Sequence, residues 1–64
     1  MFCRLELLTR DDQGVHVIAT RYVTGASLVD VREIADRACR RVHAPGYRIS
    51  DLHTERVEED WDEV

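Results

Sequence analysis

Two cysteines and three histidines are the side chains of this 64-residue sequence with the chemistry of metal ligands or nucleophiles: Cys3, Cys39, His16, His43 and His53. Zinc sites use spacings such as C-x₂-C or H-x₃-H, and neither occurs here. A cysteine nucleophile needs a thiolate beside a base, whereas both cysteines fall on predicted apolar faces. The residues therefore predict no metal site, no cofactor and no nucleophile.

The segment 51–64 is strongly acidic, with seven carboxylates against Arg56 and a net charge of −6. The first 50 residues carry eight arginines against six acids, a net charge of +2. Neighbouring carboxylates can act as general acid and base, but a chain end offers no dry pocket to raise a carboxyl pKa. Because the sequence also lacks a glycine-rich phosphate loop and a nucleophile elbow, it does not predict an enzyme.

An acidic surface can instead imitate nucleic acid, because carboxylates are steered into a basic groove as phosphates are. A tryptophan within such a surface can anchor an interface. The candidate partner-binding residues are Glu55, Glu58, Glu59, Asp60, Trp61, Asp62 and Glu63. The alternative interpretation is that the tryptophan closes the end of the core with solvated acids beside it.

An alternative contact surface is basic and consists of Arg37, Arg40, Arg41 and Arg48. A nucleic-acid binder is normally basic overall and carries aromatic side chains that stack on bases. The net charge of −4 and the small number of aromatic residues disfavour direct nucleic-acid binding. A solvated helix face with salt bridges explains the same arginines.

The elements that must position these residues begin with two strands. Residues 2–9 alternate between apolar and polar types, and residues 15–23 are rich in β-branched residues, so both segments predict strands. The polar residues 10–14 between them predict a five-residue hairpin turn, with Gly14 at a positive φ. On the second strand the expected inward residues are Val15, Val17, Ala19 and Val23.

A helix is predicted to begin after Ser27, which lies three residues before Asp30 in the spacing of a capping box. Its expected buried stripe is Leu28, Val31, Ala35, Ala38 and Val42, widened by Ile34 and Cys39. The sequence Ala44-Pro45-Gly46 ends the helix.

A third strand is predicted to open at residues 47–49, with a bulge at residues 50–51 where the alternation breaks. From Thr54 the pattern fits a helix or a strand, and in a strand Val57, Glu59 and Trp61 would share a face.

The sequence thus predicts one small α+β domain over residues 1–64, with the order β-β-α-β. Its antiparallel three-stranded sheet has one helix on one face and is followed by an acidic C-terminal tail. We expect the first strand in the middle; the alternative places the third strand parallel to the second through a right-handed crossover.

Ile18 and Tyr22 are expected to face away from the helix, so a second copy or a protein partner would cover them. The N-terminal residues lack the apolar run of a signal peptide, and no segment has the length of a membrane span, so cytoplasm is the expected location. Two buried thiols suit that location, although the two cysteines could instead form one disulfide.

The layout resembles small phage-encoded anti-CRISPR proteins that act on type I, multisubunit CRISPR effectors. The features that carry the resemblance are the β-β-α-β order, the helix start at Ser27-Leu28, Ile34-Ala35 in mid-helix, Gly46-x-x-Ile49 entering a strand, and a late Trp61. The resemblance implies a non-enzymatic inhibitor in the cytoplasm of an infected or lysogenic bacterium. Such an inhibitor would bind an effector subunit and block target DNA. A small homodimeric regulatory module is the alternative.

Overall fold

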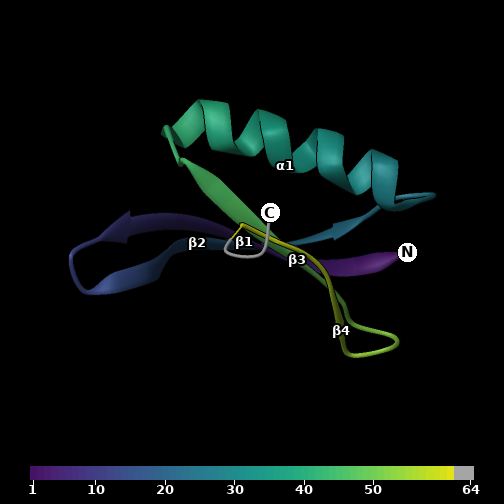
Figure 1. The fold of residues 1–64 in the computed structure, drawn as a ribbon. Helices are drawn as coiled ribbons and strands as arrows, with labels where there is room; N and C mark the ends of the chain where they lie inside the picture. The colour runs from purple at the N-terminus through teal and green to yellow at the C-terminus, as the bar shows by residue number, and fades with distance from the viewer. Residues whose placement is uncertain (62–64) are drawn as a thin grey trace.

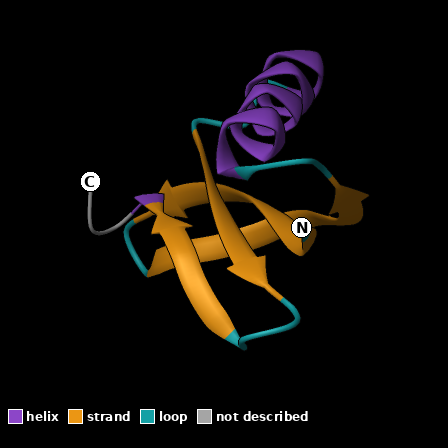
Figure 2. Ribbon diagram, turned by 90° about the vertical axis from the view of Figure 1, so that its right-hand side faces the viewer, coloured by secondary structure: helices purple, strands orange, loops and turns teal. Residues whose placement is uncertain are grey.

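A computed structural model describes residues 1–61 as an antiparallel sheet with one helix on one of its faces (Figures 1 and 2). The elements are β1 (Phe2–Asp11), β2 (Gly14–Thr24), α1 (Leu28–Val42), β3 (Gly46–Asp51) and β4 (Arg56–Asp60). The α+β class is confirmed. The prediction of three strands followed by an acidic tail is wrong, because part of the acidic segment forms β4 at the sheet edge.

The order across the sheet is β2-β1-β3-β4, which confirms β1 in a central position and excludes the parallel alternative. Strand β1 alternates as predicted, and Cys3, Leu5 and Leu7 are fully buried on the face that the helix covers. We call this the helix face of the sheet, and the opposite side the open face. Figure 1 shows α1 on one side of the sheet and no element over the other.

The hairpin between β1 and β2 is tighter than predicted, with Asp12 and Gln13 alone between the strands. Gly14 has a φ of 117°, which confirms the expected glycine position. One carboxylate oxygen of Asp11 accepts hydrogen bonds from the Gln13 backbone N–H at 2.8 Å and from His16 Nε2 at 3.0 Å. These bonds lower the pKa of Asp11 and hold the turn.

Strand β2 contains a bulge that reverses part of the predicted pattern. Leu7 pairs with Ala19 but Leu8 pairs with Val17, so Ile18 is the extra residue. Ala19 packs against the core as expected. Val17 lies opposite Leu8 on the open face and is exposed, and Val15 follows it there; the prediction that both point inward is wrong.

Helix α1 starts where predicted, but the capping box does not form. The Ser27 side chain makes no cap hydrogen bond, and Asp30 instead accepts a hydrogen bond from the Ala26 backbone N–H at 3.0 Å. The helix ends at Val42, because His43 adopts the left-handed conformation with a φ of 59°.

The predicted helix stripe is confirmed except at its last position. Val31 and Ala35 are fully buried, while Leu28, Ala38, Ile34 and Cys39 are partly buried against the core. Val42, in the last turn of the helix, is 39% exposed.

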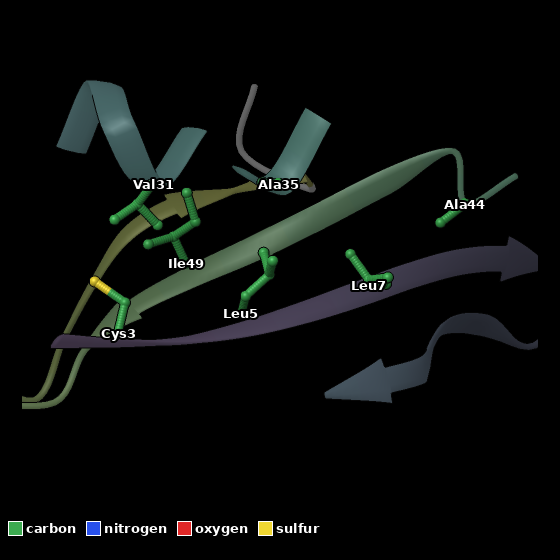
Figure 3. Close-up of a cluster of buried hydrophobic side chains, with 7 residues drawn as sticks. All are labelled: Cys3, Leu5, Leu7, Val31, Ala35, Ala44 and Ile49. Atoms are coloured by element: carbon green, nitrogen blue, oxygen red, sulfur yellow. The ribbon is translucent and has the colours of Figure 1, made fainter. Parts of the chain in front are cut away.

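Figure 3 shows the core, in which Val31 and Ala35 of α1 face the side chains that rise from β1 and β3. The described members of this cluster are Cys3, Leu5, Leu7, Val31, Ala35, Ala44 and Ile49. The helix makes its main contacts with β1 and β3. Strand β2 is therefore left beside the helix rather than beneath it.

The bulge predicted in the third strand lies in its partner instead. Strand β3 pairs with β1 without a break, whereas Ile49 pairs with Glu59 and Ser50 with Val57, so Glu58 is the extra residue of β4. The bulge puts Val57 and Glu59 on opposite faces, so the prediction of a shared face for them is wrong. Asp51 holds the turn before β4 by accepting a hydrogen bond from the His53 backbone N–H at 2.8 Å.

Candidate protein-binding site

Glu59 lies on the helix face of the sheet, where it pairs with Ile49 across the strands. Its carboxylate forms an ion pair with Arg32 of α1 and accepts a hydrogen bond from the Tyr47 hydroxyl at 3.3 Å. Burial and the nearby Glu59 charge raise the pKa of Tyr47. Glu59 therefore ties the edge strand to the helix and is not displayed as a free acid.

Asp60 lies on the open face and accepts a hydrogen bond from Arg48 Nε at 3.1 Å. Arg48 also reaches Glu6 at 3.5 Å, and Glu6 lies 3.6 Å from Arg4. These four side chains form a row of alternating charge across β1, β3 and β4, which we call the charge row. Burial alone would lower the pKa of Arg48. The hydrogen bonds and negative charges of Asp60 and Glu6 have the larger combined effect, so the pKa of Arg48 is raised.

Trp61 packs on the start of β3 instead of projecting as an anchor. A Cβ at Gly46 would overlap the indole ring, and the guanidinium carbon of Arg10 lies 4.6 Å from the ring centroid. Gly46 pairs with Leu8, which is fully buried on the open face. This position favours the interpretation in which the tryptophan closes the end of the folded structure.

Two of the six predicted contact acids are left facing solvent without an ion pair among the described residues. Glu55 is exposed in the turn before β4, and Glu58 is half-buried at the bulge. Asp62 and Glu63 lie outside the described residues. Glu59 and Asp60 form ion pairs with arginines of the fold and are not free acids, while the role of the acidic residues in binding a partner stays a prediction.

The arginines of the alternative surface do not form one patch. Arg37, Arg40 and Arg41 are exposed on α1, whereas Arg48 belongs to the charge row on the open face. The expected solvated helix face is present in part, since Arg37 lies 3.8 Å from Glu33 one turn earlier.

The cysteines and histidines are dispersed over the fold. Both cysteines are free thiols. Within residues 1–61, no three His, Cys, Asp or Glu side chains meet in an arrangement that could hold a metal ion. Burial raises the thiol pKa of Cys3 and of Cys39, and the Cys39 thiol also lies 3.6 Å from the Gly46 carbonyl oxygen, to which it donates. Neither thiol has the environment of a nucleophile.

Alkylation tests this assignment of the cysteines. At about pH 8 we expect iodoacetamide to modify both thiols more slowly in the folded protein than in denaturant, because the thiolate is the reactive form and burial disfavours it. Cys39 should react before Cys3, which has no exposed surface. Peptide mass spectrometry over time measures both rates. Faster reaction in the folded state would contradict the assignment.

The open face carries exposed apolar side chains that are not among the candidate partner-binding residues predicted from the sequence. Phe2, Val17, Tyr22 and Val57 are 51%, 46%, 64% and 51% exposed. The rings of Phe2 and Tyr22 stack with their centroids 6.4 Å apart. Tyr22 was expected on this face and is found there opposite Arg4. Val17 and Val57 were missed because two bulges set their direction.

A pocket of about 170 Å³ lies between the second half of α1 and Trp61, and its lining is mainly apolar. The lining residues are Asp36, Cys39, Pro45, Gly46, Tyr47, Glu59 and Trp61. Two of its polar groups, the Tyr47 hydroxyl and the Glu59 carboxylate, already bond each other. The pocket therefore offers little polar chemistry for a substrate.

The one helix of the described chain is too short and too polar to cross a membrane.

Charge, exposure and burial together make the open face the strongest candidate for contact with another molecule. Comparisons with protein-family models, curated proteins and solved structures give no match to this chain.

Proposed function

We propose that this protein is a non-enzymatic binding module that acts by contacting another protein through the open face of its sheet. The observation that carries the proposal is the exposure of Phe2, Val17, Tyr22 and Val57 on one side of so small a protein. Apolar side chains that stay exposed on one face of a small protein can mark an interaction site. A chain of this size also buries only about 60% of its unfolded surface, so a partner would add to its stability.

The charge row favours a protein over nucleic acid as the partner. Arg4 and Arg48 alternate with Glu6 and Asp60, so the two positive charges of the row are balanced by two negative ones. Binding to nucleic acid draws on an excess of positive charge that releases counterions from the phosphates. A balanced polar row flanked by apolar side chains instead suits a protein interface, in which polar groups set the register.

The partner class in this proposal comes from the resemblance to anti-CRISPR proteins. In it, the protein inhibits a type I CRISPR effector by covering a subunit surface that target DNA must reach. Among the residues that the structure describes, mimicry of phosphates would rest on Glu55 and Glu58, because Glu59 and Asp60 are engaged within the fold. Steric coverage by the open face needs no such mimicry.

The test compares two double variants for binding to a purified type I effector. Tyr22→Ser with Val57→Ser removes two apolar side chains from the open face, and affinity should fall by about tenfold or more if they are interface anchors. Val29→Ser with Val42→Ser is the matched control, because these residues are exposed on α1. Binding is measured by surface plasmon resonance, and inhibition by target-DNA capture.

Three outcomes of this comparison overturn parts of the proposal. A larger loss in the helix control moves the contact surface to α1. A loss confined to Glu55→Gln with Glu58→Gln assigns the contact to acidic mimicry. If the wild-type protein binds no effector and light scattering shows a dimer that the open-face variant breaks, the homodimeric module replaces the inhibitor.

A further inference from the structure

A groove of about 270 Å³ runs between β2 and α1 on the helix face of the sheet. It exists because α1 packs mainly over β1 and β3, which leaves β2 beside the helix. Apolar side chains form its floor and arginines lie along it. The lining residues are Leu5, Arg21, Tyr22, Val23, Ile34, Arg37, Ala38 and Arg41.

The groove is positively charged although the protein as a whole is acidic. Its lining contains three arginines and no carboxylate. Arg21 donates to the Thr20 carbonyl oxygen at 3.2 Å, and Arg37 lies 3.8 Å from Glu33 with both side chains well exposed. Such exposed contacts are weak, so the guanidinium groups remain available to an anion that enters the groove.

One wall of the groove is an edge strand. Strand β2 has 11 residues and is hydrogen-bonded to β1 on one side only among the described elements. Every second residue along its outer side presents backbone N–H and C=O groups without a strand partner. An extended peptide that adds to such an edge forms main-chain hydrogen bonds and places alternate side chains against the groove.

We propose that this groove binds an extended acidic segment of a partner protein, which adds to β2 as a further strand. Side chains of the segment on the helix side alternate between acidic residues, which pair with Arg21, Arg37 and Arg41, and an apolar residue over Val23 and Ile34. This surface lies on the helix face and shares only Tyr22 with the open face, so the inference does not depend on the function proposed above.

Charge decides between this occupant and the alternatives. In a symmetric dimer through β2, the same groove would face itself and bring arginines of both copies together, which is unfavourable. Nucleic acid would meet the three arginines but also the negative charge of the whole protein, and its bases would find no exposed aromatic row along the groove. An acidic peptide satisfies both the arginines and the free strand edge.

The experiment uses a fluorescein-labelled synthetic peptide with threonine at every second position and glutamate and valine in turn at the others. We expect saturable binding by fluorescence anisotropy, with amide shifts in NMR spectra confined to residues 19–23 and 34–41. Arg37→Gln with Arg41→Gln should weaken binding by about tenfold or more, because both charged partners are lost. Arg40→Gln with Arg56→Gln is the matched control, since both residues are exposed outside the groove.

Two control peptides separate the two parts of the recognition. Glutamine in place of glutamate removes the charge and should weaken binding. N-methylation of alternate backbone amides removes main-chain donors and should abolish it. The proposal is overturned if both arginine pairs lose affinity equally, if the N-methylated peptide binds as well as the parent, or if a labelled oligonucleotide occupies the groove more tightly than the peptide.

Discussion

Replacing Val31 with aspartate will unfold the protein. The Val31 side chain has no exposed surface and packs in the core between α1 and the central strands (Figure 3). An unpaired charge at this position costs several kcal/mol, and the chain is too small to hold a large reserve of stability. Far-UV circular dichroism at about 25 °C should show that the native spectrum is lost.

Val29 supplies the matched control for that change. It lies two residues earlier on the same helix and is 59% exposed. Val29→Asp introduces the same side chain with the same helix propensity, so it should leave the melting temperature within a few degrees of the wild type. A cooperative, wild-type melting curve for Val31→Asp would show that the assigned helix face is incorrect.

Alanine at Gly46 should displace Trp61 and destabilise the protein by about 1–3 kcal/mol, the range expected for overpacking. The added Cβ would overlap the indole ring of Trp61. Neither group can move aside easily, because the Cβ is fixed to the backbone and the indole is rigid. Because Trp61 is the single tryptophan of the sequence, its fluorescence reports this site alone. We expect its emission to shift to the red as the ring becomes solvated, and the urea midpoint to fall.

A double-mutant cycle separates this overlap from other effects of the added methyl group. In a Trp61→Ala background the obstacle is gone, so Gly46→Ala should cost little further stability. The interaction energy between the two sites should then be comparable to the cost of Gly46→Ala alone. Strictly additive effects would show that Trp61 does not pack on Gly46.

The parts of the fold that follow from local patterns could be predicted from the sequence. The alternation of Cys3, Leu5 and Leu7 identifies β1 and its inward face, and the 3-4 spacing around Val31 and Ala35 identifies the helix stripe. Both patterns depend on residues close together in the chain. The central position of β1 follows from the order of the elements, because the helix crossing lets the third strand run antiparallel to β1.

The acidic edge strand and its ion pairs could not be predicted in this way. Glu59 is stabilised by Arg32 and Tyr47, which lie 27 and 12 residues away in sequence, so no local signal reveals the pair. Strand β4 also carries residue types that strands usually avoid, and arginines from other elements compensate their charge. The faces of Val17 and Val57 depend on two bulges, and each bulge is visible only once the partner strand is known.

The two bulges also indicate where this chain can change length during evolution. Deleting a paired residue would turn every side chain beyond it to the wrong face of the sheet. Ile18 and Glu58 have no partner across the strands, so loss of either would leave every existing pair in register. Both positions lie on edge strands, away from the buried cluster. Single-residue deletions in descendants of this sequence should therefore accumulate at residues 18 and 58 and be purged from β1 and β3.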